Sequence, residues 1–176
     1  MAWRLLTYRL EADASRHRVA IWRELRKVGA VSLQNATWAV PAGPGFDEAV
    51  ERAVALIERA DSTALLFDIV PAGPTTAAVL EEMFSAEREA EWTEFVSDCA
   101  KFDVEIASEI AKRKFTLAEL DEEEQNLERL RRWYREIRSR DIFAAPSAAV
   151  AERRLKECAE VLEDFANQVY EARTQP

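Results

Sequence analysis

A long stretch with almost no glycine or proline is the feature that most restricts how this chain can fold. From "PAGPTT" at residues 71–76 onward, apolar residues recur at helical spacing. Glycine and proline are the residues that most often end helices, so their scarcity together with this spacing predicts long helices. We therefore expect two domains, one at residues 1–74 and an all-α domain with three long helices at residues 75–176.

The three long helices are expected after a short helix over about residues 76–84. Thr116 and Ser147 can cap the second and third of them. Their apolar stripes are Trp92, Phe95, Val96, Cys99, Phe102, Ile106 and Ile110 in the first, Leu120, Leu127, Leu130, Tyr134 and Ile137 in the second, and Ala151, Leu155, Cys158, Leu162, Phe165, Val169 and Ala172 in the third. Helices of about 24 to 30 residues are too long to lie behind a four-stranded sheet. They would pack as an antiparallel bundle or against a second copy of the chain, so a homodimer is expected.

The first seventy residues alternate strand and helix patterns. Residues 3–10 ("WRLLTYRL") predict a strand, and Ser15 can cap a helix that ends at Gly29. Ile21, Trp22, Leu25 and Val28 form the expected buried stripe of that helix. Two short strands ("AVSL" and "TWAV"), a helix over residues 45–61 and a buried strand over residues 63–70 follow. The β-α-β-β-α-β order is the ferredoxin-like arrangement, so the fold is expected to be α+β.

Composition excludes several classes of protein. The chain is 48% apolar and 32% charged, as in water-soluble globular proteins. No apolar run is long enough to cross a bilayer, and "MAWRLLTYRLEAD" lacks the apolar core of a signal peptide, so a cytoplasmic protein without membrane contact is expected. The single histidine, His17, and the two cysteines cannot build a disulfide framework or a Cys/His zinc site. We therefore expect no metal and no cofactor.

The charge of the chain is unevenly distributed. The net charge is −9, but residues 1–34 hold seven Lys or Arg against three Asp or Glu. An acidic chain is a poor general binder of nucleic acid, because neutralising phosphates supplies most of the non-specific affinity. Only a local basic surface could bind DNA or another anion.

The helix over residues 15–28 carries the first such surface. Arg16, Arg23 and Lys27 share one face at spacings of seven and four, and Arg18 lies at the head of the apolar stripe. A half-buried arginine needs a partner, so one interpretation pairs Arg18 with Asp47 or Asp68. The other interpretation is a surface that binds an oxyanion or a partner, because guanidinium groups match the geometry of oxyanions.

The stretch "ERLRRWYREIRSRD" at residues 128–141 carries the second basic surface. Its candidate ligands are Arg131, Arg132, Arg135, Arg138 and Arg140, with Trp133 at the edge of the apolar stripe. Arginines beside an exposed aromatic ring can bind phosphate or a chromate-like oxyanion. The alternative is a solvated face whose arginines pair with Glu128 and with the acidic last helix.

The acidic residues and known motifs do not assemble a catalytic site. The stripe Glu87, Glu91, Glu94, Asp98, Glu105 and Glu109 lies opposite an apolar stripe and reads as a solvent face. Glu123 falls in the apolar register, so it is either exposed at a frayed helix start or paired with an arginine of another helix. Phosphate-binding loops and nucleophile motifs are absent from the sequence, and we expect a protein that is not an enzyme.

Two blocks of the sequence resemble a known family. The first block is "WRLLTYRL" with "SRHRVAIWRELRKVGAVSLQNATWAVP", and the second is "LERLRRWYREIRSRDIFAAP". Both resemble the N-terminal domain of the chromate-resistance protein ChrB family, and more distantly the PaaX transcriptional repressors. The resemblance implies a ferredoxin-like domain with a helical appendage, in proteins associated with chromate sensing or with regulation of chromate efflux. The matching candidate residues are Arg18, Trp22, Arg23, Trp38, Arg132, Arg135, Arg140 and Asp141. We find no winged-helix pattern of the PaaX type in residues 1–176, so we expect no DNA-reading module of that kind in this stretch.

Three functional hypotheses follow. The leading one is a regulatory or accessory protein of chromate resistance that senses a small oxyanion through arginines. The second is a repressor that binds promoter DNA through the basic face of the first helix. The third is a metal-dependent nuclease like the CRISPR-associated Cas2 proteins, because Asp13 follows the first predicted strand.

Overall fold

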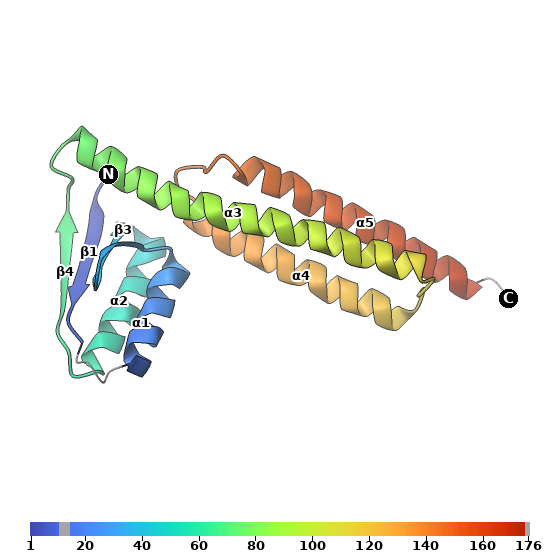
Figure 1. The fold of residues 1–176 in the computed structure, drawn as a ribbon, viewed down its shortest axis with the longest axis horizontal. Helices are drawn as coiled ribbons and strands as arrows, with labels where there is room; N and C mark the ends of the chain where they lie inside the picture. The colour runs from blue at the N-terminus through green and yellow to red at the C-terminus, as the bar shows by residue number, and fades with distance from the viewer. Residues whose placement is uncertain (11–14, 175–176) are drawn as a thin grey trace. The chain divides into compact units, whose positions relative to one another are not determined.

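The computed structural model describes residues 1–10 and 15–174, apart from the side chain of Ser15. The chain forms two compact units, Met1–Arg88 and Glu89–Pro176. The first contains a four-stranded antiparallel sheet with two helices, and three long helices pack together after it (Figure 1). The expected α+β class is confirmed.

The sheet of the first unit has the order β2-β3-β1-β4. Its strands are β1 (Trp3–Tyr8), β2 (Val31–Gln34), β3 (Thr37–Pro41) and β4 (Ala64–Ile69). β1 is central and pairs with β3 and β4, so that Leu6 lies opposite both Trp38 and Leu66. This register matters for the site, because it places alternate side chains of β1 and β3 on one side of the sheet.

Two helices, α1 (Ser15–Val28) and α2 (Pro44–Glu58), lie on the same side of the sheet (Figure 1). α1 ends at Gly29 as predicted, with φ of 80°. The N–H of Gly29 donates to the carbonyl of Arg26 at 3.0 Å, and that of Ala30 donates to Leu25 at 2.9 Å. This bond pair is the Schellman motif, in which glycine avoids the cost of the left-handed conformation.

Two burial predictions for the first unit are wrong. Trp22 was expected in the buried stripe of α1, but it is 49% exposed. Successive helical residues point about 100° apart, and Ile21, Leu25 and Val28 already fill the core side. β4 was expected to be a buried strand, but Leu65 and Phe67 are about half exposed because β4 is an edge strand with a neighbour on one side only.

The helix after β4 is longer than predicted. α3 (Pro74–Ala111) is one continuous helix of 38 residues, whereas a break near Phe84 was expected. Residues 85–91, "SAEREAE", contain good helix formers and no glycine or proline, so nothing ends the helix there. In the first unit, the ring of Phe84 meets the rings of Trp3 and Phe46 edge-on at centroid distances of 6.0 and 6.1 Å.

The second unit consists of α3 from Glu89 onward, α4 (Leu117–Arg140) and α5 (Ala148–Thr174). The predicted apolar stripes form its core, with Trp92, Phe95, Ile106, Leu130, Ile137 and Phe165 among the buried residues. Ala172 is the exception, because it is exposed in the last turn of α5. Thr116 caps α4 as predicted, its hydroxyl accepting from the N–H of Glu119 at 3.3 Å. The hydroxyl of Ser147 instead donates to Glu89 at 2.5 Å.

Glu123 was expected either to be exposed at a frayed helix start or to pair with an arginine of another helix. Both expectations are wrong. It is only 5% exposed and accepts one hydrogen bond, from Nδ2 of Asn126 on the same helix at 3.2 Å. Burial raises the pKa of its carboxyl, and the charges of Glu105, Glu122 and Glu109 raise it further against the effect of Asn126. At neutral pH this carboxylate is therefore destabilising.

We expect Glu123→Gln to stabilise the protein at pH 7 by on the order of 1 kcal/mol, because glutamine keeps an acceptor for Asn126 without the buried charge. A raised pKa in the folded state means that the wild-type penalty grows as pH rises from about 4.3, the ordinary glutamate value, through that raised pKa. The advantage of the variant should therefore vanish near pH 4. Urea unfolding at pH 7 and at pH 4 measures the gain in stability, with the exposed Glu124→Gln as control. Equal gains at both pH values would contradict this reading.

Candidate anion-binding site

A pocket of about 550 Å³ opens in the first unit. It lies at the end of β1, beside α1 and the β2–β3 hairpin. Its lining residues are Tyr8, Arg9, Leu10, Arg18, Trp22, Arg26, Ser32, Asn35, Ala36, Trp38 and Glu87. This volume is within the range of small-molecule sites, and aromatic and cationic side chains dominate the lining.

Helix periodicity and strand register bring these side chains together. Arg18, Trp22 and Arg26 are spaced by four residues and so share one face of α1. On the sheet, Ser32 of β2 lies opposite Trp38 of β3. The backbone N–H of Tyr8 donates to the carbonyl of Ala36 in the hairpin turn at 3.0 Å, which fixes Tyr8 beside the hairpin.

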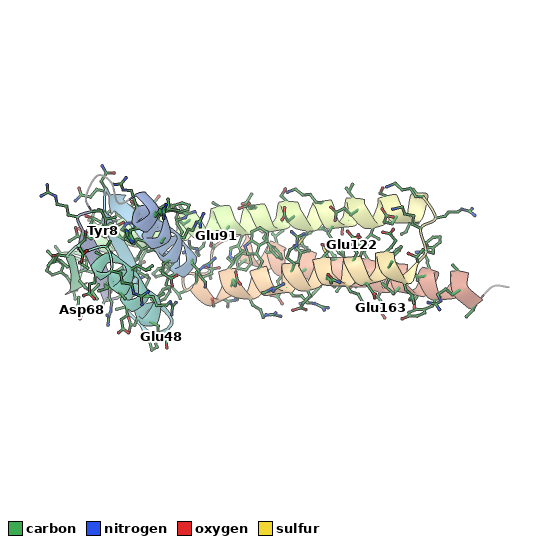
Figure 2. All side chains as sticks on the ribbon, turned by 90° about the horizontal axis from the view of Figure 1, so that it is seen from below. Tyr8, Glu48, Asp68, Glu91, Glu122 and Glu163 are labelled. Atoms are coloured by element: carbon green, nitrogen blue, oxygen red, sulfur yellow. The ribbon has the colours of Figure 1, made fainter. Side chains whose placement is uncertain are left out.

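Three aromatic residues form the walls of the pocket: Tyr8, Trp22 and Trp38. Trp38 is only 7% exposed, and its indole nitrogen has no hydrogen-bond partner of normal geometry among the described residues. Tyr8 is labelled in Figure 2. Burial raises the pKa of its hydroxyl, while the nearby Trp38 indole and then the charge of Arg18 act in the opposite direction. Tyr8 therefore stays protonated at neutral pH and can donate a hydrogen bond. A buried N–H without a partner is costly, so a ligand that accepts from Trp38 would remove that cost.

The charge of the pocket is positive although the chain is acidic. Among the described lining residues, Arg9, Arg18 and Arg26 contribute three cations and Glu87 one carboxylate. Nη1 of Arg26 donates to Oε2 of Glu87 on α3 at 2.6 Å. The side chain of Arg18 is exposed at the rim, close enough to act on the Tyr8 hydroxyl. The arrangement suits a small anion that also contacts aromatic surfaces.

Three of the residues predicted from the sequence, Arg18, Trp22 and Trp38, line this pocket. The pairing of Arg18 with Asp47 or Asp68 is wrong, because Nε of Arg4 lies 3.0 Å from Asp47 and 3.5 Å from Asp68. Arg16, Arg23 and Lys27 are exposed on another face of α1 and are not part of the pocket lining.

Sequence reasoning missed several lining residues. They are Tyr8, Arg9, Leu10, Arg26, Ser32, Asn35, Ala36 and Glu87. Arg26 had a usable signal, because it follows Trp22 by four residues on the same helix face. Glu87 had none, since its contact with Arg26 spans 61 residues of sequence.

The arginine-rich stretch of α4 belongs to the second unit, and most of its arginines have partners there. Arg135 and Arg131 lie 3.0 and 3.9 Å from Glu128. Arg138 donates to the carbonyl of Asp141 at 3.1 Å, and Arg140 pairs with Glu91 of α3 at 3.2 Å. Arg132 is exposed, and the ring of Trp133 packs against Phe95 with centroids 5.5 Å apart.

Asp141 holds the turn between α4 and α5. It is 3% exposed, and its carboxylate accepts from Nε1 of Trp92 at 2.9 Å. The same carboxylate accepts from the N–H of Ala145 at 3.0 Å. The Arg-Asp pair of the second family block therefore joins α4 to α3, with Arg140 bound to Glu91 and Asp141 bound to Trp92.

The described residues offer little for metal chemistry. Within residues 1–10 and 15–174, no group of three or more His, Cys, Asp or Glu side chains could hold a metal ion. Asp13, on which the nuclease hypothesis rests, lies outside the described residues. In the same ranges, no helix is long and apolar enough to span a membrane.

Fold and pocket together define a class: a small α+β unit with a cationic, aromatic pocket, followed by a unit of three helices. A family model described as "Protein ChrB, N-terminal" matches residues 18–176. The chain belongs to this family, which is linked to chromate resistance. The match includes Arg18, Trp22 and Trp38 of the pocket, as well as Arg140 and Asp141. Comparison with curated proteins gave no match.

Proposed function

We propose that this protein is a non-enzymatic regulatory or accessory protein of chromate resistance that senses a small oxyanion in the pocket of its first unit. Membership of the ChrB N-terminal family supports the link to chromate. The observation that carries the oxyanion part is the buried indole N–H of Trp38, which has no hydrogen-bond partner of normal geometry among the described residues, in a pocket that also holds Arg18. The strand order β2-β3-β1-β4 with two helices supports the ferredoxin-like assignment of this unit.

Chromate and sulfate are tetrahedral dianions with four acceptor oxygens, and the pocket supplies donors of several kinds. The guanidinium of Arg18 offers two parallel N–H groups, and Trp38 and Tyr8 offer one donor each. The aromatic walls limit water around these donors, which strengthens each charge-assisted bond. Binding needs no proton transfer and no covalent step.

A bound oxyanion would also compete for Arg26. Its present partner, Glu87, lies on α3 within the first unit. An anion that draws Arg26 into the pocket would release Glu87, so that ligand occupancy changes a contact between α1 and α3. Through this exchange, we expect the binding of an anion to change how α1 contacts α3 within the first unit.

Isothermal titration calorimetry with chromate and, separately, with sulfate tests the proposal. We expect saturable heat with chromate at submillimolar to millimolar concentration. No heat above the buffer blank at millimolar anion would remove the oxyanion part of the proposal. Equal heats for both anions would leave the site as a general oxyanion site and would remove its selectivity for chromate.

A second candidate function is a DNA-binding repressor. It is favoured by the exposed face of α1 with Arg16, Arg23 and Lys27, which is separate from the pocket. The triple alanine variant at these positions should abolish a salt-dependent shift of promoter DNA. The matched control replaces Arg131, Arg132 and Arg135 with alanine, which removes the same charge from the second unit. Promoter DNA that wild-type protein fails to shift at low salt would exclude this function.

The expected homodimer stays a prediction. The exposed Leu65 and Phe67 of the edge strand β4 are a surface on which a second copy could pack. Sedimentation velocity measures the oligomeric state of the wild type, which we expect to be a dimer, and of Phe67→Asp, which we expect to be a monomer. A wild type that sediments as a monomer at micromolar concentration would exclude the dimer.

A further inference from the structure

The only two cysteines of this chain meet in the core of the second unit. Cys99 lies on α3 and Cys158 on α5, and both are fully buried. Sγ of Cys158 is 3.7 Å from the backbone carbonyl oxygen of Cys99. Each thiol is also the largest influence on the pKa of the other, so the two side chains are neighbours in this core.

An ion pair covers the two thiols. Arg154, one turn before Cys158, pairs with Asp103, one turn after Cys99, and also with Glu157. Oδ1 of Asp103 lies 3.7 Å from Sγ of Cys158. The side chains of Asp103 and Arg154 are 33% and 23% exposed. Asp103, which contacts the Cys158 sulfur, is therefore itself partly open to solvent.

The two thiols are chemically different. The hydrogen bond from the Cys158 thiol lowers the pKa of Cys99, and the positive charge of Arg154 lowers it further against burial. The same hydrogen bond and burial raise the pKa of Cys158. Cys99 is thus the first of the pair to become a thiolate, while Cys158 keeps its proton.

We propose that Cys99 and Cys158 form a reversible dithiol site that a peroxide oxidises to an α3–α5 disulfide. The Cys99 thiol releases its proton to solvent, and its thiolate attacks one peroxide oxygen. The O–O bond breaks, Cys99 becomes a sulfenic acid, and the other oxygen leaves as hydroxide, which takes up a proton from solvent to become water. The Cys158 sulfur then attacks Sγ of Cys99, an S–S bond forms and the sulfenic oxygen leaves as a second water. The two thiols lose two electrons and the peroxide gains them.

This site is independent of the pocket and goes beyond anion sensing. The disulfide would connect residues that are 59 positions apart and would join the first and last helices of the second unit. Closing a loop of this length restricts the unfolded chain, so oxidation should stabilise the unit. Cys99 and Cys158 already lie next to each other on α3 and α5, so the bond would join neighbouring side chains.

The test exposes the folded full-length chain to submillimolar hydrogen peroxide, then unfolds it in denaturant with an alkylating reagent. We expect two alkylated cysteines before oxidation and none after it. The intact mass should be that of the chain less two hydrogens, and a Cys99–Cys158 cross-linked peptide should appear after digestion. Reduction with dithiothreitol should restore both alkylation sites.

Single-cysteine variants are the controls. In Cys158→Ala, which keeps the site apolar, peroxide should give a sulfenic acid or no reaction at Cys99 and no rise in the thermal midpoint of unfolding. The wild-type midpoint should rise on oxidation and return on reduction. The proposal would be overturned if both thiols could still be alkylated after peroxide treatment, or if cross-links formed between chains in place of the internal one. An equal rise in the thermal midpoint of Cys158→Ala would also overturn it.

Discussion

Replacing Asp141 with alanine is expected to destabilise the protein by about 3 kcal/mol. The buried carboxylate accepts from Nε1 of Trp92 and from the N–H of Ala145, and alanine leaves both donors buried without a partner. Hydrogen bonds to charged groups contribute about 1.5–3 kcal/mol each. Urea unfolding followed by circular dichroism measures the loss, together with a fall of roughly 10 °C in the thermal midpoint.

Two further variants make the Asp141 result specific. Asp141→Asn keeps one acceptor oxygen, so it should lose about half as much stability as Asp141→Ala. Asp164→Ala removes an exposed aspartate from α5 and should change stability by less than about 0.5 kcal/mol. A loss below about 1 kcal/mol for Asp141→Ala would mean that this turn does not hold the second unit together.

Arg18→Gln is expected to weaken oxyanion binding by about 10- to 100-fold. Glutamine removes the positive charge and the paired N–H donors of the guanidinium, which are together equivalent to about 1.5–3 kcal/mol in a charge-assisted interaction. Calorimetry with chromate measures the change in Kd. Because this side chain is exposed, we expect the thermal midpoint of unfolding to change little.

Arg23→Gln is the matched control for Arg18→Gln. It removes the same charge from the same helix, but Arg23 lies on an exposed face and is not part of the pocket lining. We expect its Kd for chromate to stay within about twofold of wild type, allowing for long-range screening. If both variants weaken binding equally, the effect is one of net charge and the pocket is not the site.

Helix periodicity was sufficient to predict the core of the second unit, but it could not place the site of the first. Leu127, Leu130, Phe165 and their neighbours recur at the spacing of a buried stripe, and they are buried. Ile21 and Trp22 are adjacent apolar residues on α1, and either one could face the core. The packing of the sheet decides between them, because Ile21 fills the interior and Trp22 is left at the pocket.

Contacts between residues far apart in the sequence could not be predicted from the sequence either. Arg18 lines the pocket, and Arg4 of β1 contacts the acidic residues that one interpretation assigned to Arg18. The contact of Arg26 with Glu87 and the contact of Cys99 with Cys158 each span about sixty residues. Such contacts depend on how the elements pack, and a single sequence without its fold shows only the separate residues.

The five tryptophans of the chain offer the most direct test of the anion pocket. In a ¹⁵N–¹H NMR titration with chromate, assigned with single Trp→Phe variants, we expect the indole N–H signals of Trp38 and Trp22 to shift saturably. Those of Trp3, Trp92 and Trp133, which are not part of the pocket lining, should stay in place. A spectrum without shifts at millimolar chromate, or one in which only Trp133 of the arginine-rich α4 responds, would contradict binding in the first unit.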